Sequence, residues 1–127
     1  MPRAAALPNL SPARLDIDTY RGDTLRLRVQ LRARGRAVDV HGWLFNAEVR
    51  ATPDGAKLGV IDVIPVNDGK LGVLQLTLTP DQSALFPEYS VWDLESVDSR
   101  DRVRTLLRGG LTVVADVTRS GQMRSGR

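Results

Sequence analysis

The chain has 127 residues, of which 42% are hydrophobic and 26% charged, the size and composition of one soluble globular domain. It contains no cysteine and one histidine, His41, which excludes a disulfide scaffold and thiolate metal sites and leaves little material for a Ser-His-Asp site. The formal net charge of +3 arises at the ends, because residues 1–14 and 119–127 hold five arginines and no acidic residue. We therefore do not expect an enzyme, and we expect no catalytic, cofactor-binding or metal-binding residues.

The N-terminus has only a short apolar stretch before Pro8, too short for a signal peptide or a membrane span. We expect a soluble protein made in the cytoplasm. Residues 1–14 are expected to form an N-terminal arm, residues 15–118 a single domain, and residues 119–127 a flexible C-terminal tail. Because ordering such ends costs backbone entropy, we expect both to become ordered only against neighbouring subunits.

From residue 15 onward, apolar and polar side chains alternate, which is the pattern of extended strands. A first strand is expected at residues 15–19. The next, at residues 25–33, alternates leucine, valine and alanine with arginine and glutamine, so we predict one buried face and one exposed arginine face. The turn Arg34-Gly35-Arg36 should then reverse the chain.

The following strand begins near Ala37, and its apolar positions slip by one residue at His41-Gly42, where we predict a β-bulge. A turn at residues 53–55, a strand at residues 57–64 and a hairpin connection at Asn67-Asp68-Gly69 come next. The strand after that connection is expected at residues 71–79.

The sequence Thr79-Pro80-Asp81-Gln82 predicts one helical turn near residues 80–86, with a threonine N-cap and a capping box. Leu85 and Phe86 are expected to fill the end of the core. Strands should follow at residues 89–97 and from residue 102 onward, joined by a turn at residues 98–101. Because the last strand would be too long for a small domain, we predict a kink at Gly109-Gly110.

About seven strands, regularly spaced turns and almost no helix predict an all-β fold, an antiparallel immunoglobulin-like β-sandwich. A small closed barrel is the alternative.

Several groups of residues could act in catalysis, metal binding or ligand binding, but we prefer a structural interpretation of each. Two aspartate pairs, Asp16/Asp18 and Asp98/Asp101, are interpreted as exposed strand and turn residues, and His41 as a turn residue. Asp62 with residues 67–69 lacks the ligand spacing of a calcium loop. Four aromatic residues are assigned to the core rather than to stacking on a ligand: Trp43, Phe45, Tyr89 and Trp92.

Arginines are the most distinctive surface feature of the sequence. They could bind an acidic protein or nucleic acid, or pair across the sheet with acids such as Glu48. We favour a structural or protein-facing role over nucleic acid. The interaction candidates are Arg3, Arg26, Arg28, Arg32, Arg34, Arg36, Arg119, Arg124 and Arg127.

Three stretches together resemble one family. The first is Asp18-Thr19-Tyr20-Arg21-Gly22-Asp23-Thr24, and the second is the run from Val38 to Arg50 containing Val-Asp-Val-His-Gly-Trp. The third is Val91-Trp92-Asp93-Leu94 followed by residues 103–109 (Val-Arg-Thr-Leu-Leu-Arg-Gly) and by Leu111-Thr112-Val113 to Asp116-Val117-Thr118-Arg119. The order is similar to the β-sandwich domain of tailed-phage virion proteins, namely the LtfC-like proteins of actinobacteriophages and, more loosely, the N-terminal domain of phage baseplate upper proteins. His41 stands where the pattern has threonine.

The resemblance implies a non-enzymatic virion component, a small adaptor or accessory protein in the tail tip, baseplate or fibre-attachment region. Its partners would be other phage structural proteins, with several copies in a symmetric assembly, and it would need no cofactor, membrane or small-molecule substrate. A capsid decoration protein and a nucleic-acid-binding module are the alternatives.

Overall fold

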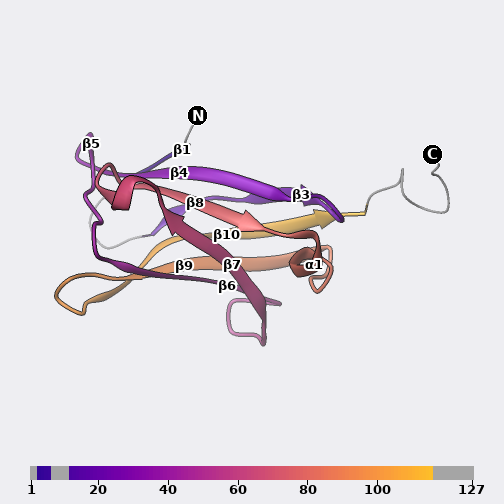
Figure 1. Cartoon of the computed structure of the whole chain (residues 1–127). Helices are drawn as coiled ribbons and strands as arrows, with labels where there is room; N and C mark the ends of the chain where they lie inside the picture. The colour runs from indigo at the N-terminus through magenta and orange to yellow at the C-terminus, as the bar shows by residue number, and fades with distance from the viewer. Residues whose placement is uncertain (1–2, 7–11, 116–127) are drawn as a thin grey trace.

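A computed structural model describes residues 3–6 and 12–115 of the chain, the first of these segments by its backbone. Strands make up most of it (Figure 1). In chain order the elements are β1 (Arg3–Ala6), β2 (Ala13–Arg14), β3 (Ile17–Tyr20), β4 (Leu25–Ala33), β5 (Arg36–Ala37), β6 (Leu44–Arg50), β7 (Lys57–Pro65), the 3-10 segment η1 (Val66–Gly69), β8 (Val73–Leu78), the helix α1 (Pro80–Ser83), β9 (Tyr89–Val97) and β10 (Val103–Val114). The prediction of an all-β chain with one short helical turn is confirmed.

The strands form one curled sheet in the order β1-β4-β8-β7-β6-β9-β10-β2, with β5 beside β4 and β3 beside β10. Strand β7 joins its two halves, because Lys57–Ile61 pairs with β6 whereas Asp62–Pro65 pairs with β8. We call the part with β4 and β8 the β4 half, and the part with β6, β9 and β10 the β9 half. The immunoglobulin-like sandwich is therefore not confirmed: the halves face one another, but a shared strand connects them (Figure 1).

The N-terminal segment pairs with both edges of this sheet. Strand β1 runs parallel to β4, whereas β2 and β3 run parallel to β10. The expectation that the arm becomes ordered only against other subunits is thus wrong for residues 3–6 and 13–14. Backbone pairing with the chain's own strands compensates the entropy cost of ordering these residues.

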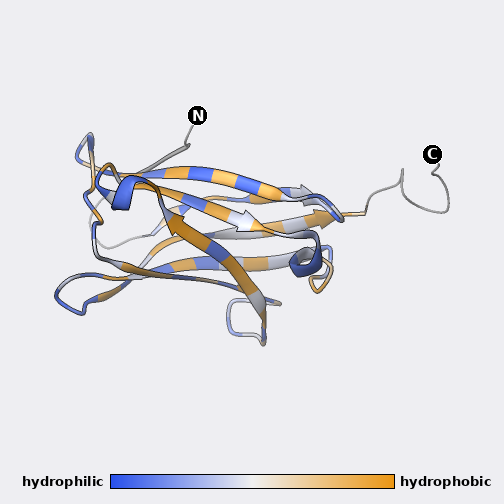
Figure 2. Cartoon of the chain, viewed as in Figure 1, coloured by the Kyte–Doolittle hydropathy of each residue, from blue (hydrophilic) through white to orange (hydrophobic). Residues whose placement is uncertain are grey.

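The core lies between the two halves and is made of the inward-facing apolar side chains of both. Alternate colours along β4, β8 and β9 in Figure 2 follow this division into inner and outer positions. The largest completely buried side chains are Leu31, Leu74, Leu76, Leu78, Leu94, Leu106, Leu107, Leu111, Val29, Val40, Val49 and Val113. As predicted, β4 occupies residues 25–33, and its arginines face away from this core.

The predicted helical turn after β8 is present as α1 (Pro80–Ser83). Thr79 forms the expected capping box, accepting a hydrogen bond from the backbone of Gln82 while the Gln82 side chain accepts one from the backbone of Thr79. Phe86 is buried at the end of the core, but Leu85 is 68% exposed, so that half of the prediction is wrong. The helix ends at Ser83, two residues before Leu85.

The predicted bulge at Gly42 and the predicted kink at Gly109-Gly110 are not found at these positions. Gly42 is not in a bulge: its φ of 80° belongs to a turn, closed by the hydrogen bond from Trp43 N to Val40 O, at which the chain leaves the β4 half and enters β6. Strand β10 is continuous through Gly109 and Gly110, and its irregularity lies between Thr105 and Leu107.

The glycine pair in β10 instead makes room for the N-terminal segment. Leu15 donates its backbone N–H to the carbonyl of Arg108, and the Leu15 carbonyl accepts a hydrogen bond from the Trp92 indole at 2.9 Å. A Cβ atom at Gly109 would overlap the carbonyl of Leu15, whereas at Gly110 its nearest neighbour would be 3.6 Å away. The two glycines are therefore not equivalent.

We expect Gly109→Ala to lower the free energy of unfolding by about 2 kcal/mol or more, because backbone must move to admit the methyl group. The matched control Gly110→Ala should change it by less than about 0.5 kcal/mol. Urea unfolding followed by the fluorescence of buried Trp92 measures both. Equal effects of the two substitutions would show that the close approach at Leu15 does not matter.

The capping box gives a second prediction. Thr79→Ala should cost about 0.5–2 kcal/mol of stability, because it removes the side-chain acceptor of the first helical turn. Thr24→Ala, at an exposed position outside the strands, serves as the control and should be close to neutral. A neutral Thr79→Ala variant would contradict a stabilising role for the cap.

Candidate functional site

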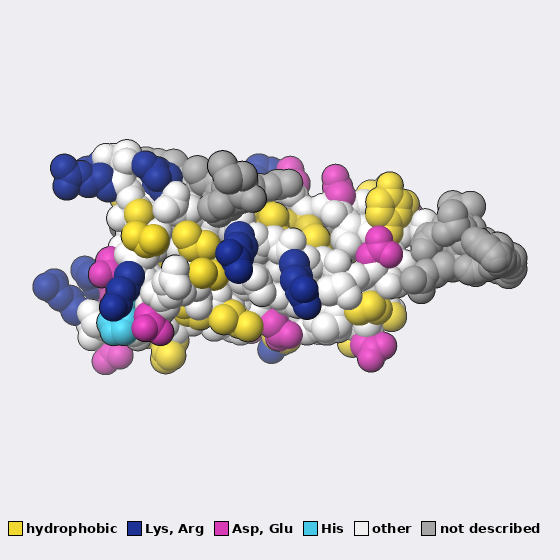
Figure 3. All heavy atoms as spheres, turned by 45° about the horizontal axis from the view of Figure 1, so that its top comes forward, with side chains coloured by type: hydrophobic (Ala, Val, Ile, Leu, Met, Phe, Trp, Pro, Cys, Tyr) yellow, Lys and Arg dark blue, Asp and Glu magenta, His cyan; other side chains and the backbone are white. Residues whose placement is uncertain are grey.

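The outer surface of the β4 half carries a row of arginines, which we call the arginine face. Alternation along β4 points Arg26, Arg28 and Arg32 outward. The β4–β5 hairpin carries two further arginines: Arg34 lies in its turn, and Arg36 pairs with Ala33 and so faces the opposite way from Arg32. All except the half-buried Arg32 are exposed. In Figure 3, basic side chains lie across the middle of the molecule's upper surface and at its left end. The structure thus places three of the predicted interaction candidates, Arg26, Arg28 and Arg32, on one surface, whereas Arg34 and Arg36 lie in the adjoining hairpin.

Neutral groups hold two of these guanidinium groups in place. Arg28 Nε donates to Gln75 Oε1 on the neighbouring strand β8 at 3.2 Å. Arg32 donates to Gln30 Oε1 at 3.1 Å and to the carbonyl of Gly35 at 2.6 Å. These bonds orient the guanidinium groups but leave their positive charge uncompensated.

Within residues 12–115, no carboxylate oxygen lies within 4 Å of a guanidinium of the arginine face; the ion pairs there belong to Arg14, Arg50, Lys57 and Arg102. The alternative pairing of the arginines with Glu48 is wrong, because Glu48 lies in the β9 half and binds Arg50 and Lys57. Within the described residues, no ion pair therefore neutralises the arginines of this face.

The other arginine candidates are only partly described. Arg3 begins β1, which runs beside β4 with Arg3 in register with Val29. Arg119, Arg124 and Arg127 lie outside the described residues.

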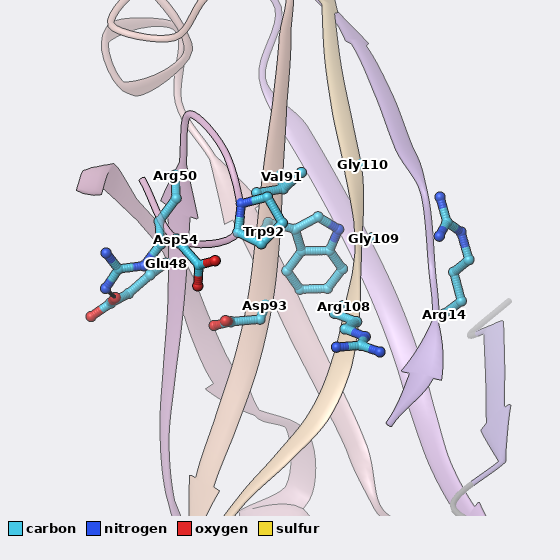
Figure 4. A pocket seen from close by; sticks show the side chains of 11 residues that line it. Arg14, Glu48, Arg50, Asp54, Val91, Trp92, Asp93, Arg108, Gly109 and Gly110 are labelled. Atoms are coloured by element: carbon cyan, nitrogen blue, oxygen red, sulfur yellow. Dashed lines mark hydrogen bonds and ion pairs between the residues drawn. The ribbon is translucent and has the colours of Figure 1, made fainter. Parts of the chain in front are cut away.

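The outer surface of the β9 half holds a groove of about 510 Å³ that the sequence analysis did not identify. Three cross-strand neighbours, Glu48, Asp93 and Arg108, lie on its floor (Figure 4). Around them lie Arg14, Arg50, Pro53, Asp54, Val91, Trp92, Gly109 and Gly110. Its charges are mixed, unlike those of the arginine face. Register across β6, β9 and β10 assembles the groove, and only knowledge of strand order could have predicted it.

Two carboxylates in the groove have opposite pKa shifts. Burial raises the pKa of Asp93, the nearby Glu48 carboxylate adds to this, and Arg50 opposes it. A hydrogen bond from Asn46 lowers the pKa of Glu48, together with bonds and charge from Arg50 and Lys57. Asp93 is thus the carboxylate in the groove whose charge is least favoured by its surroundings.

Asp16 and Asp98, one from each aspartate pair that could offer acid–base chemistry, have structural roles. Asp16 accepts a hydrogen bond from the backbone N–H of Gly110 at 2.8 Å and pairs with Arg14, and both interactions lower its pKa. Asp98 accepts backbone hydrogen bonds from Arg100 and Arg102 and closes the β9–β10 turn, which likewise lowers its pKa. Each carboxylate is held as the anion by neighbouring donors.

His41 is exposed and lies in a turn, as predicted, with Nδ1 3.2 Å from the carbonyl oxygen of Asp68. In the described segments no group of three or more histidine and carboxylate side chains could hold a metal ion. Nor does any helix there have the length and apolar character needed to cross a membrane.

The aromatic assignments hold for three of four residues. Trp92 is buried, and Trp43 and Phe45 are half-buried against the core. Tyr89 is 70% exposed, so its assignment to the core is wrong. As the first residue of β9, it shares the outer face with Val91 and Asp93, because side chains two positions apart lie on one side of a strand.

Comparisons with known proteins give structural likenesses but no sequence match to a family model or a curated protein. A solved structure, the N-terminal domain of phage TP901-1 ORF48, is similar in fold, with a TM-score of 0.54 and 11% sequence identity over 88% of this chain and 97% of that one. The fold is thus shared with a phage protein domain.

Asp93 supplies a pH prediction. Because its folded pKa is raised, the ionised carboxylate costs folding free energy at neutral pH, and this cost disappears as the pH falls through the raised pKa toward the ordinary value of 3.8. Asp93→Asn should therefore be more stable than the wild type at pH 7, and the difference should vanish at low pH. Denaturant unfolding at several pH values measures it, with Glu95→Gln on the same face of β9 as the control. A variant less stable at pH 7 would show that attraction to Arg108 and Arg50 outweighs burial.

Proposed function

We propose that this protein is a non-enzymatic structural component of a tailed-phage virion. The observation that carries the proposal is its similarity in fold to a phage protein domain along nearly the whole length of both chains. The sequence resemblance to phage virion β-sandwich domains, including the LtfC-like proteins, supports the same proposal independently. Such a protein acts by presenting a rigid surface to its neighbours.

Within the virion, we place the protein in the tail tip, baseplate or fibre-attachment region, as a small adaptor or accessory protein present in several copies. The arginine face supports a role in binding other proteins, because its charges have no carboxylate partner within the described residues. A position on the capsid surface is the second candidate, since the same fold could decorate a head.

The test is to locate the protein in purified particles. Mass spectrometry of virions separated from free protein should detect it, and antibody labelling in electron micrographs should mark the tail end of the particle. Labelling of the head would favour the capsid alternative. Absence from particles that contain all other structural proteins would overturn the proposal.

A further inference from the structure

We propose that the arginine face binds an extended acidic segment of a neighbouring virion protein; this inference rests on the proposed function and identifies the chemistry of its partner. The binding surface is formed by Arg26, Arg28 and Arg32 on β4.

Charge is the first argument. Three guanidinium groups, those of Arg26, Arg28 and Arg32, share one surface. The nearest outward-facing carboxylate in the register of β4, β8 and β7 is that of Asp62, which lies two strands from Arg26 across Thr77. In the β9 half, by contrast, acids and bases alternate and form ion pairs with one another. Like charges along one strand repel one another in the free protein. A partner that supplies carboxylates relieves this repulsion, which favours the complex.

Positioning is the second argument. Because Gln75, Gln30 and the Gly35 carbonyl already orient Arg28 and Arg32, these side chains lose little further freedom when they bind. The acceptors are neutral, so each guanidinium keeps its full charge, and its remaining N–H donors are available to a carboxylate. A guanidinium held in this way can form the paired hydrogen bonds that make arginine–carboxylate contacts specific.

Spacing is the third argument. Arg26 and Arg28 are two residues apart on a strand, which separates them by about 7 Å. Carboxylates at alternate positions of an extended peptide repeat at the same distance, so successive side chains can meet successive arginines.

Nucleic acid fits this surface less well than an acidic peptide. Single strands are held by stacking on aromatic side chains. The described outward side chains around the arginines on β8 and β7 are Val73, Gln75, Thr77, Asp62 and Ile64, none of which is aromatic. The three arginines lie on the face of a sheet rather than on a helix that could enter a duplex groove.

A binding assay with defined probes tests the proposal. The probe is a fluorescein-labelled peptide of fourteen alternating threonine and glutamate residues, and its control has glutamine in place of glutamate. A labelled DNA duplex and a labelled single strand, each of twenty nucleotides per strand, test the alternative. Fluorescence anisotropy is measured with the full chain at about 50 mM and about 150 mM salt, because interactions between exposed charges are screened more strongly at the higher concentration.

The wild-type protein should bind the glutamate peptide and not the glutamine peptide. The double variant Arg26→Gln/Arg28→Gln should bind about tenfold more weakly, because two arginine–carboxylate contacts are lost. The matched control Arg100→Gln/Arg108→Gln removes the same charge from exposed positions of the β9–β10 region and should change affinity less than about twofold. Circular dichroism verifies that both variants fold.

Three results would overturn the inference: no binding of the glutamate peptide, an equal loss in both double variants, or tighter binding of either DNA probe at about 150 mM salt with a steep salt dependence. These failures are separate from failure of the proposed function. A protein found in virions that ignores the glutamate peptide would keep the proposed function and lose this inference, whereas peptide binding by a protein absent from virions would do the reverse.

Discussion

The alternating strands can bury their apolar faces only if the sheet folds back on itself. A sheet has two sides, and in this protein one side of nearly every strand carries leucine or valine. Curling brings the inner sides of β4 and β8 against those of β9 and β10 and removes them from water. Strand β7 makes the curl possible because its first half pairs with β6 and its second half with β8.

The same alternation fixes the outer surfaces. Once the leucines and valines of β4 face the core, its arginines must face solvent, so the arginine face follows directly from the packing of the core. On the β9 half, the outward positions hold both acids and bases, and they line a groove of mixed charge. The molecule thus presents a surface rich in arginine on one half and a surface of mixed charge on the other.

The N-terminal segment links these two regions. It pairs with β4 through β1 and with β10 through β2 and β3, and the Leu15 carbonyl fits beside Gly109 to reach the indole of Trp92. The glycine therefore serves close backbone approach rather than a bend. This explains why the predicted kink is absent: the strand needs no change of direction there, only the space that a missing Cβ provides.

The features that depend on neighbouring residues could be predicted from the amino-acid sequence: strands β4 and β9 with their boundaries, the capping box at Thr79, and the outward direction of the arginines of β4. Each rests on side-chain alternation or on hydrogen bonds between residues close in the chain. Other features became visible only in the folded chain: the shared strand β7, the pairing of the N-terminal segment, the exposure of Tyr89 and the groove around Asp93. These depend on strand order and register between residues far apart in the chain, which periodicity does not contain, because alternation assigns a residue to one side of its strand but leaves open which strand lies beside it.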